Sequence, residues 1–288
     1  MTNLKKPVWL TLRIREGGSL DRMTQLLEAC HLHTVCESAH CPNINECFAR
    51  KTCTFMILGN VCTRNCTFCA IKHGDPSPVD SLEPQAVASA ARQLGLQYVV
   101  VTSVTRDDLP DGGSSHFTAT IRAIRDEIPK ATIEVLIPDF MGDKNSLCKV
   151  IDATPNVINH NIETVPRIYS LVRPKALYTR SLLLLHRVHE FGNNILTKSG
   201  LMLGLGETEK EVLKVMEDLR TVHCDVLTLG QYLSPSLAHY PVVEYIHPDI
   251  FKKLEKIGYD MGFTEVYAGP LVRSSYHADN IFSRAVKV

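Results

Sequence analysis

The sequence lacks a long apolar run and an excess of charge of either sign. Its 31 lysine and arginine residues balance 31 aspartate and glutamate residues, so the formal net charge is zero. This balance argues against a general nucleic-acid-binding protein, which needs positive charge to neutralise phosphates. The longest apolar runs, such as residues 98–101 and 182–185, are far shorter than the ~20 residues of a membrane span. We therefore expect no nucleic-acid partner and no membrane partner.

The amino-terminal residues also lack the apolar region of a secretory signal, which predicts a cytoplasmic protein. Disulfides are rare in that reducing compartment. The chain nevertheless has ten cysteines among 288 residues, and eight of them lie between positions 30 and 69. We expect these cysteines to bind metal or to take part in catalysis.

Short β-branched runs alternate with longer segments of helical periodicity. Strands are predicted at residues 54–58, 97–102, 132–137, 157–161, 199–203 and 226–230, with another possible at 265–268. Helices are predicted at residues 84–94, 114–128, 143–152, 177–191 and 207–222. This α/β alternation indicates parallel strands, in an open sheet or a partly closed barrel. Polar and glycine-rich segments after the strands favour a partial (β/α)6 barrel of the TIM type, with its site at the carboxyl ends of the strands.

Three cysteines directly follow the first predicted strand. Cys62, Cys66 and Cys69 have the spacing C-x3-C-x2-C, which puts three thiolates on one short loop. Three thiolates leave one iron of a [4Fe-4S] cluster open to an exchangeable molecule. The motif, with aromatic Phe68 before its last cysteine, resembles the signature of the radical S-adenosylmethionine superfamily. A structural zinc site is the alternative, but such sites usually have four closed ligands.

A second triplet, Cys36, Cys41 and Cys47, has the spacing C-x4-C-x5-C. Alone it could bind zinc with His40 as a fourth ligand. The two triplets together resemble the lipoyl synthase family, whose members insert two sulfur atoms into a protein-bound octanoyl chain. Further segments similar to that family are residues 102–113, 159–164, 172–174, 197–208, 227–233 and 273–278.

The resemblance implies two [4Fe-4S] clusters and S-adenosylmethionine as cofactors. It also implies a division of the chain into an amino-terminal cysteine-rich extension (residues 1–53), a radical S-adenosylmethionine partial barrel (residues 54–245) and a carboxy-terminal extension that closes over the site (residues 246–288). The six cysteines and S-adenosylmethionine leave one iron without a ligand. In the family a serine of an R-S-S-Y segment fills this position, which implies Ser275 here, with Ser274 as the close alternative.

An alkoxide is a harder and poorer ligand for iron than a thiolate, which suits a cluster that is consumed. Cys30 and Cys53 flank the triplets and are further candidates for the missing ligand. Most free cysteines, however, are small buried hydrophobic residues.

The resemblance further implies a pocket for S-adenosylmethionine at the carboxyl ends of the strands. Its candidate residues are Phe68, Asp111, Gly112, Gly113, Asn161, Glu163 and Arg173. The Asp-Gly-Gly segment resembles the superfamily element that binds the methionine ammonium, although Pro-Asp-Gly-Gly is also ordinary turn chemistry. The asparagine and glutamate are acceptors for ribose and ammonium, and the arginine complements the carboxylate or is a solvated cation at a helix end.

The implied activity is that of a sulfurtransferase with Cys62, Cys66, Cys69 and Ser275 as catalytic residues. S-adenosylmethionine is cleaved to a 5′-deoxyadenosyl radical that removes hydrogen from C6 and C8 of octanoyl-lysine, and the second cluster donates the sulfur. Implied partners are octanoylated lipoyl domains of 2-oxoacid dehydrogenase complexes and glycine-cleavage H protein, a ferredoxin or flavodoxin reductant, and iron-sulfur assembly proteins. The alternatives are another two-cluster sulfur-inserting enzyme with a different substrate and a non-catalytic metal scaffold.

Overall fold

The computed structural model describes residues 5–11, 19–50 and 52–287. Its main sheet has eight strands in the order β1-β2-β5-β6-β7-β8-β9-β10. These strands are β1 (His33–Thr34), β2 (Thr54–Ile57), β5 (Tyr98–Ser103), β6 (Thr132–Leu136), β7 (Val157–Asn159), β8 (Leu196–Leu203), β9 (Val226–Gln231) and β10 (Glu265–Gly269). Neighbours from β2 to β10 are all parallel, and β1 is antiparallel to β2. The predicted parallel α/β sheet is confirmed, and the possible strand at 265–268 belongs to it.

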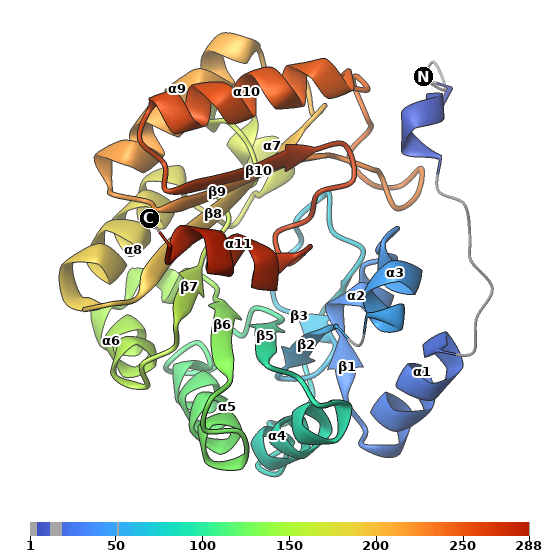
Figure 1. The fold of residues 1–288 in the computed structure, drawn as a ribbon, viewed down its shortest axis with the longest axis vertical. Coiled ribbons are helices and arrows are strands. Elements are labelled where there is room, and N and C mark those ends of the chain that lie inside the picture. Colours follow the sequence, from blue (N-terminus) through green and yellow to red (C-terminus); the bar gives the residue numbers. More distant parts are fainter. Residues whose placement is uncertain (1–4, 12–18, 51, 288) are drawn as a thin grey trace.

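Helices cover the outer surface of this curved sheet (Figure 1). The long ones are α1 (Ser19–Ala29), α4 (Glu83–Leu94), α5 (Ser114–Glu127), α6 (Lys144–Asp152), α8 (Tyr178–Phe191), α9 (Glu209–Thr221), α10 (Pro248–Asp260) and α11 (Ala278–Ala285). Short helices are α2 (Val35–Ser38), α3 (Ile44–Ala49) and α7 (Tyr169–Val172), and a small sheet joins β3 (Val61–Cys62) to β4 (Lys72–His73). Among the described helices, none is long and apolar enough to cross a bilayer.

Helix α9 illustrates how local sequence specifies an element. The Thr208 hydroxyl accepts a hydrogen bond from the Glu211 backbone N–H, and the Glu211 carboxylate accepts one from the Thr208 N–H at 2.8 Å. This capping box satisfies two donors at the start of the helix. The buried face of the helix consists of Val212, Val215, Met216 and Leu219. The predicted helical pattern in this segment is confirmed.

Alternation along the strands separates the core from the barrel interior. On β5, Val99 and Val101 are fully buried in the hydrophobic core, whereas Tyr98, Val100 and Thr102 line the interior cavity. Successive side chains of a strand point to opposite faces, so every second residue faces the interior.

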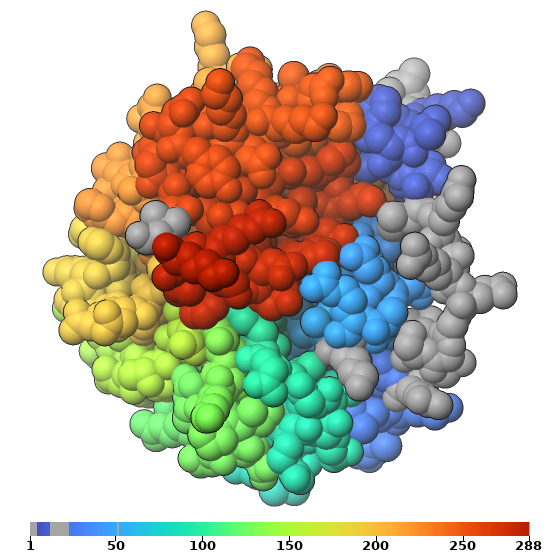
Figure 2. Space-filling model, in the orientation of Figure 1, coloured from blue at the N-terminus to red at the C-terminus, as the bar shows by residue number. Residues whose placement is uncertain are grey.

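The segments near the two chain ends lie side by side at the rim of the barrel (Figure 2). The Asn43 side chain donates a hydrogen bond to the Leu271 carbonyl at 2.7 Å, and the Tyr276 hydroxyl donates one to Glu46 at 2.9 Å. The boundaries predicted at residues 53 and 245 stay predictions. Residues 1–4, 12–18 and 51 of the amino-terminal extension lie outside the described residues.

Candidate functional site

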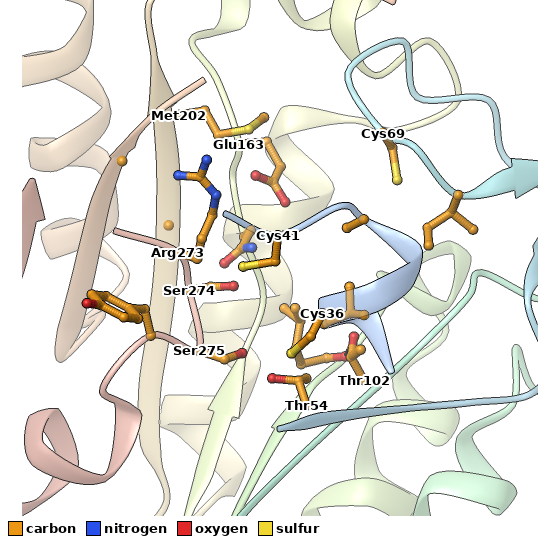
Figure 3. Close-up of a pocket in the computed structure, with 18 of the residues that line it drawn as sticks. Cys36, Cys41, Thr54, Cys69, Thr102, Glu163, Met202, Arg273, Ser274 and Ser275 are labelled. Atoms are coloured by element: carbon orange, nitrogen blue, oxygen red, sulfur yellow. Dashed lines mark hydrogen bonds between the residues drawn. The ribbon is translucent and has the colours of Figure 1, made fainter. Parts of the chain in front are cut away.

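The barrel interior and the two terminal segments enclose one cavity of about 600 Å³. Most of the predicted site residues line it, from both triplets and from the carboxy-terminal segment (Figure 3). They are Cys36, Cys41, Cys47, Cys62, Cys66, Phe68, Cys69, Asn161, Glu163, Arg173, Ser274 and Ser275. The volume lies within the range usual for ligand pockets in proteins.

The first triplet stands on the loop that follows β2. The Cys62 sulfur accepts hydrogen bonds from the backbone N–H groups of Arg64 at 3.4 Å and Thr105 at 3.3 Å. Backbone hydrogen bonds from Thr63 to Thr105 and from Thr67 to Val172, both 3.0 Å, tie the loop to the ends of neighbouring elements. The thiols are thereby held at the carboxyl-end rim of the barrel.

An ion-pair network beneath this loop was not predicted from the sequence. The buried Arg64 guanidinium pairs with Asp107 at 2.7 Å and with Asp139 at 2.5 Å, and Arg180 pairs with Asp139 at 3.3 Å. Burial alone would raise the pKa of Asp139, but hydrogen bonding and attraction from Arg64 lower it to about 2. The Asp139 carboxylate therefore stays ionised at neutral pH, and its pairing with Arg64 holds the middle of the loop in place.

Two thiols of the first triplet, those of Cys66 and Cys69, are held in the protonated form in the metal-free chain. Burial raises the pKa of Cys69 to about 12, and the neighbouring Cys66 and Cys62 thiols add to this rise. Burial also raises the pKa of Cys66, although Arg173 opposes the rise. Iron binding must therefore displace protons from these thiols.

The second triplet is built by α2, α3 and the turn between them. The Thr34 side chain accepts a hydrogen bond from the Glu37 N–H at 3.3 Å, which starts α2 directly after β1 and carries Cys36 into the cavity. Burial, reinforced by the other thiols of this triplet, raises the pKa of Cys36 to about 12, and burial and Cys41 raise that of Cys47 to about 11. The mutual effect indicates that the three thiols lie within electrostatic range of one another.

The serine segment faces the second triplet across the cavity. In Figure 3 the hydroxyl groups of Ser274 and Ser275 point toward the side that carries Cys36 and Cys41. Burial raises the pKa of Cys41, and Arg273 opposes part of this rise, which agrees with this closeness. A side chain at Gly230 would meet the Val272 carbonyl at 2.1 Å, so only glycine permits the segment to approach β9 this closely.

The candidates for S-adenosylmethionine carry polar atoms without partners. The Arg173 Nη1 donates hydrogen bonds to the Asn161 carbonyl at 2.9 Å and to the Tyr169 hydroxyl at 2.7 Å. Its buried Nε has no partner in the described part of the chain. The buried Oδ1 of Asn161 also has no partner among the residues that the structure describes. Burial raises the pKa of Glu163, whose backbone φ is +69°. Because buried polar groups are normally paired, these atoms fit a polar ligand with a carboxylate and hydroxyl groups.

Asp111, Gly112 and Gly113 form the turn directly before helix α5 and are not among the residues that line the cavity. The Asp111 carboxylate accepts hydrogen bonds from the Gly113 N–H at 3.0 Å and the Ser115 N–H at 2.9 Å. These bonds outweigh the effect of burial and lower its pKa to about 2. In the structure these bonds stabilise the turn that precedes α5, and the cofactor contact predicted for the segment stays a prediction.

The other candidates for the missing iron ligand, Cys30 and Cys53, differ in their position relative to the cavity. Cys30 is not among the cavity-lining residues, whereas buried Cys53 lines the cavity near Cys36 and Cys47. Within the described part of the chain, no three histidine, cysteine or acidic side chains converge at the spacing for a single metal ion. A four-iron cluster is wider than one ion, so the spread of the thiols fits a cluster better than zinc with His40.

Several lining residues were missed by the sequence analysis. They include Arg64, Tyr98, Thr102, Gly200, Met202 and Arg273. The signal that identifies the strand residues is their position on the inward-facing alternation of a barrel strand.

The sequence resembles known proteins over nearly its whole length. A family model described as the radical SAM superfamily matches residues 56–219. The lipoyl synthase of Caldanaerobacter subterraneus subsp. tengcongensis is 60% identical over 276 residues, which cover 96% of this chain and 96% of that protein. The lipoyl synthase of Caldicellulosiruptor bescii is 56% identical over 280 residues, which cover 97% of this chain and 96% of the other.

Solved structures share the fold at low sequence identity. Methylornithine synthase superposes with a TM-score of 0.55 at 13% identity, covering 70% of this chain and 61% of that one. A maturase of the [FeFe]-hydrogenase gives a TM-score of 0.56 at 14% identity, covering 93% of this chain and 65% of that one. The cofactors of the present enzyme are [4Fe-4S] clusters and S-adenosylmethionine. The chain belongs to the lipoyl synthase family of radical S-adenosylmethionine sulfurtransferases.

Proposed function

We propose that the protein inserts two sulfur atoms, at C6 and C8, into the octanoyl-lysine of a lipoyl-accepting protein. The observation that carries this proposal is that both cysteine triplets and the serine segment open onto one cavity of about 600 Å³. An acyl chain in this cavity is within reach of groups bound to either triplet. One shared space is what a reaction needs when hydrogen removal and sulfur transfer occur at the same carbon.

Cys62, Cys66 and Cys69 hold the first cluster, and three polar residues orient S-adenosylmethionine beside it. The unpartnered Nε of Arg173 donates to the methionine carboxylate, and the unpartnered Oδ1 of Asn161 accepts from a ribose hydroxyl. Glu163 accepts from the methionine ammonium. Phe68 lines the same side of the cavity.

Cys36, Cys41, Cys47 and Ser275 hold the second cluster, with Ser274 as the alternative serine. When bound, the first cluster supplies the electron that cleaves S-adenosylmethionine, and the second is the sacrificial sulfur donor. The serine oxygen is the weakest protein ligand of the set and the one most readily released.

The walls between the triplets suit an alkyl chain. Val100, Leu136 and Met202 are among the apolar residues that line the cavity, so an alkyl chain inside it is kept from water. We infer that the substrates are octanoylated lipoyl domains of 2-oxoacid dehydrogenase complexes and glycine-cleavage H protein. Ferredoxin or flavodoxin is the proposed reductant, and iron-sulfur assembly proteins rebuild the consumed cluster in the cytoplasm.

An anaerobic single-turnover assay tests the proposal. Reconstituted protein is mixed with dithionite, S-adenosylmethionine and an octanoyl-lysine peptide, and iron content, 5′-deoxyadenosine and peptide mass are read together. The proposal expects about eight irons per chain, 5′-deoxyadenosine, and a peptide that gains two sulfur atoms. An unmodified peptide with 5′-deoxyadenosine formed would favour a two-cluster enzyme with another substrate.

A further inference from the structure

A fully buried ion pair links two strands of the barrel and has no part in the proposed chemistry. Glu134 on β6 and Lys198 on β8 are 0% and 1% exposed. The lysine Nζ lies 2.8 Å from one carboxylate oxygen of Glu134 and 3.1 Å from the other. Asn159 on β7 donates a further hydrogen bond to this carboxylate at 3.3 Å.

The position of this pair follows from the alternation of the strands. Glu134 and Lys198 each stand two residues before a cavity-lining residue of the same strand, respectively Leu136 and Gly200. Asn159, the last residue of β7, pairs with Lys198 in the register of the sheet. Residues two apart on a strand point to the same face, so the polar cluster forms the next layer down in the barrel interior.

Tyr98 is the member of this layer that the cavity exposes. Its hydroxyl donates a hydrogen bond to Glu134 at 2.5 Å, and its ring packs edge-on against Phe282 of α11 with centroids 5.8 Å apart. The ring is thereby held from below by the ion pair and from one side by the carboxy-terminal helix. Above it, the cavity is lined by apolar Val100 and Leu136.

The proposed reaction limits how deep this apolar space can be. C6 and C8 must reach the same reacting position in turn, so two carbons extend beyond that position when C6 reacts. A chain that is longer by two carbons needs correspondingly more depth. The depth of the cavity beyond the reacting position therefore selects the chain length.

We propose that Tyr98, supported by the Glu134–Lys198 pair, is the floor that selects an eight-carbon acyl chain. This inference rests on the proposed function. Displacement of Tyr98 by a longer chain has a high free-energy cost, because it would separate the buried and paired charges of Glu134 and Lys198. An apolar chain end gains nothing in return from a layer that is charged.

The experiment measures how chain length affects binding. Fluorescent peptides that carry hexanoyl-, octanoyl- or decanoyl-lysine are titrated by anisotropy into the anaerobic reconstituted enzyme with S-adenosylmethionine and no reductant. In the unsubstituted enzyme we expect the decanoyl peptide to bind roughly tenfold or more weakly than the octanoyl peptide. Tyr98→Ala should bring this ratio close to one, whereas Tyr98→Phe, which keeps the ring, should leave the ratio high.

Two further variants make the test independent of how well Tyr98→Ala folds. Val100→Phe fills the layer directly above the floor and should shift the preference toward the hexanoyl peptide. Tyr259→Ala removes a partly exposed tyrosine of α10 outside the cavity and should not alter any ratio. Iron content and circular dichroism report whether each variant is folded and loaded.

The outcomes separate this inference from the proposed function. Three results would overturn the proposed role of Tyr98 but not the proposed function. Tyr98→Ala and Tyr98→Phe could give the same ratio of octanoyl to decanoyl binding, or the unsubstituted enzyme could bind both peptides equally. The third result is a Val100→Phe variant whose chain-length preference does not shift. If the octanoyl peptide binds no better than the same peptide without an acyl group, the proposed function fails and the floor fails with it.

Discussion

At the scale of a single residue, substitution of Cys66 tests whether the first triplet holds a catalytic cluster or a structural metal. Cys66 lies on a loop and is only partly buried, so the barrel does not depend on its side chain for packing. We expect Cys66→Ala to keep the circular dichroism of the unsubstituted protein, to lose about half of about eight irons, and to form no 5′-deoxyadenosine. Iron analysis and product detection after reconstitution check this expectation.

The matched control is Cys224→Ala. This thiol is fully buried away from the cavity, and its sulfur lies 3.4 Å from the Val226 carbonyl. The Cys224→Ala variant should retain the full iron content and form 5′-deoxyadenosine. Unfolding of Cys66→Ala on loss of metal, as in a zinc finger, would contradict the catalytic interpretation.

The two serines make a second comparison at this scale. Because an alkoxide ligand is proposed only for Ser275, we expect Ser275→Ala to form 5′-deoxyadenosine but to transfer at least tenfold less sulfur to the octanoyl peptide. Ser274→Ala should transfer sulfur at nearly the rate of the unsubstituted enzyme. Mass spectrometry of the peptide checks both, and the reverse result would assign the ligand to Ser274.

Sequence motifs identify residues whose partners are close in the chain. The spacing of the triplets predicted which cysteines share a cavity, since each triplet occupies one short segment. Arg64 could not be paired in this way, because Asp107 and Asp139 stand 43 and 75 positions away. The contact predicted for Asp111 stays a prediction for a different reason, because an Asp-Gly-Gly turn has the same sequence whether it precedes a helix or contacts a cofactor.

At the scale of elements, an aspartate near the start of α5 and one at the N-cap of α6 each accept a hydrogen bond from a backbone N–H of the first helical turn. Asp111 accepts from the Ser115 N–H at 2.9 Å, and Asp143 accepts from the Ser146 N–H at 2.7 Å. Replacement of either aspartate by alanine should lower the free energy of unfolding by about 0.5–2 kcal/mol. Denaturant unfolding of the metal-free protein measures this loss.

The same two variants decide whether Asp111 also binds cofactor. If it acts only as a cap, Asp111→Ala and Asp143→Ala should bind S-adenosylmethionine equally well after reconstitution, as measured by equilibrium dialysis. Weaker binding by Asp111→Ala alone would restore the contact predicted from the sequence.

The strands and most helices could be predicted because their periodicity is local. Strand β1 could not, because two residues carry no periodicity, and its place depends on pairing with β2. The closeness of the two terminal segments could not be predicted either. It depends on contacts such as that between Asn43 and Leu271, which are 228 positions apart.

For the whole molecule, the buried thiols couple stability to pH. Burial raises the pKa of Cys36 to about 12 and that of Cys47 to about 11, from an ordinary 9.0. A raised thiol pKa favours the neutral form in the folded chain, so the stability it contributes is present below about pH 9. That contribution is lost as the pH rises from about 9 toward 12, because only the unfolded chain ionises readily.

We therefore expect the free energy of unfolding of the metal-free protein to fall between about pH 8 and 10.5. The fall should be larger than that of metal-free Cys36→Ala by on the order of 1–2 kcal/mol. Cys148→Ala, which removes a partly exposed thiol of α6, should follow the unsubstituted protein. In the reconstituted enzyme we do not expect the part of this loss of stability that depends on Cys36, because a thiolate bound to iron has already given up its proton. Urea unfolding across this pH range measures the difference, and parallel curves for the metal-free protein and Cys36→Ala would show that this thiol carries no such coupling.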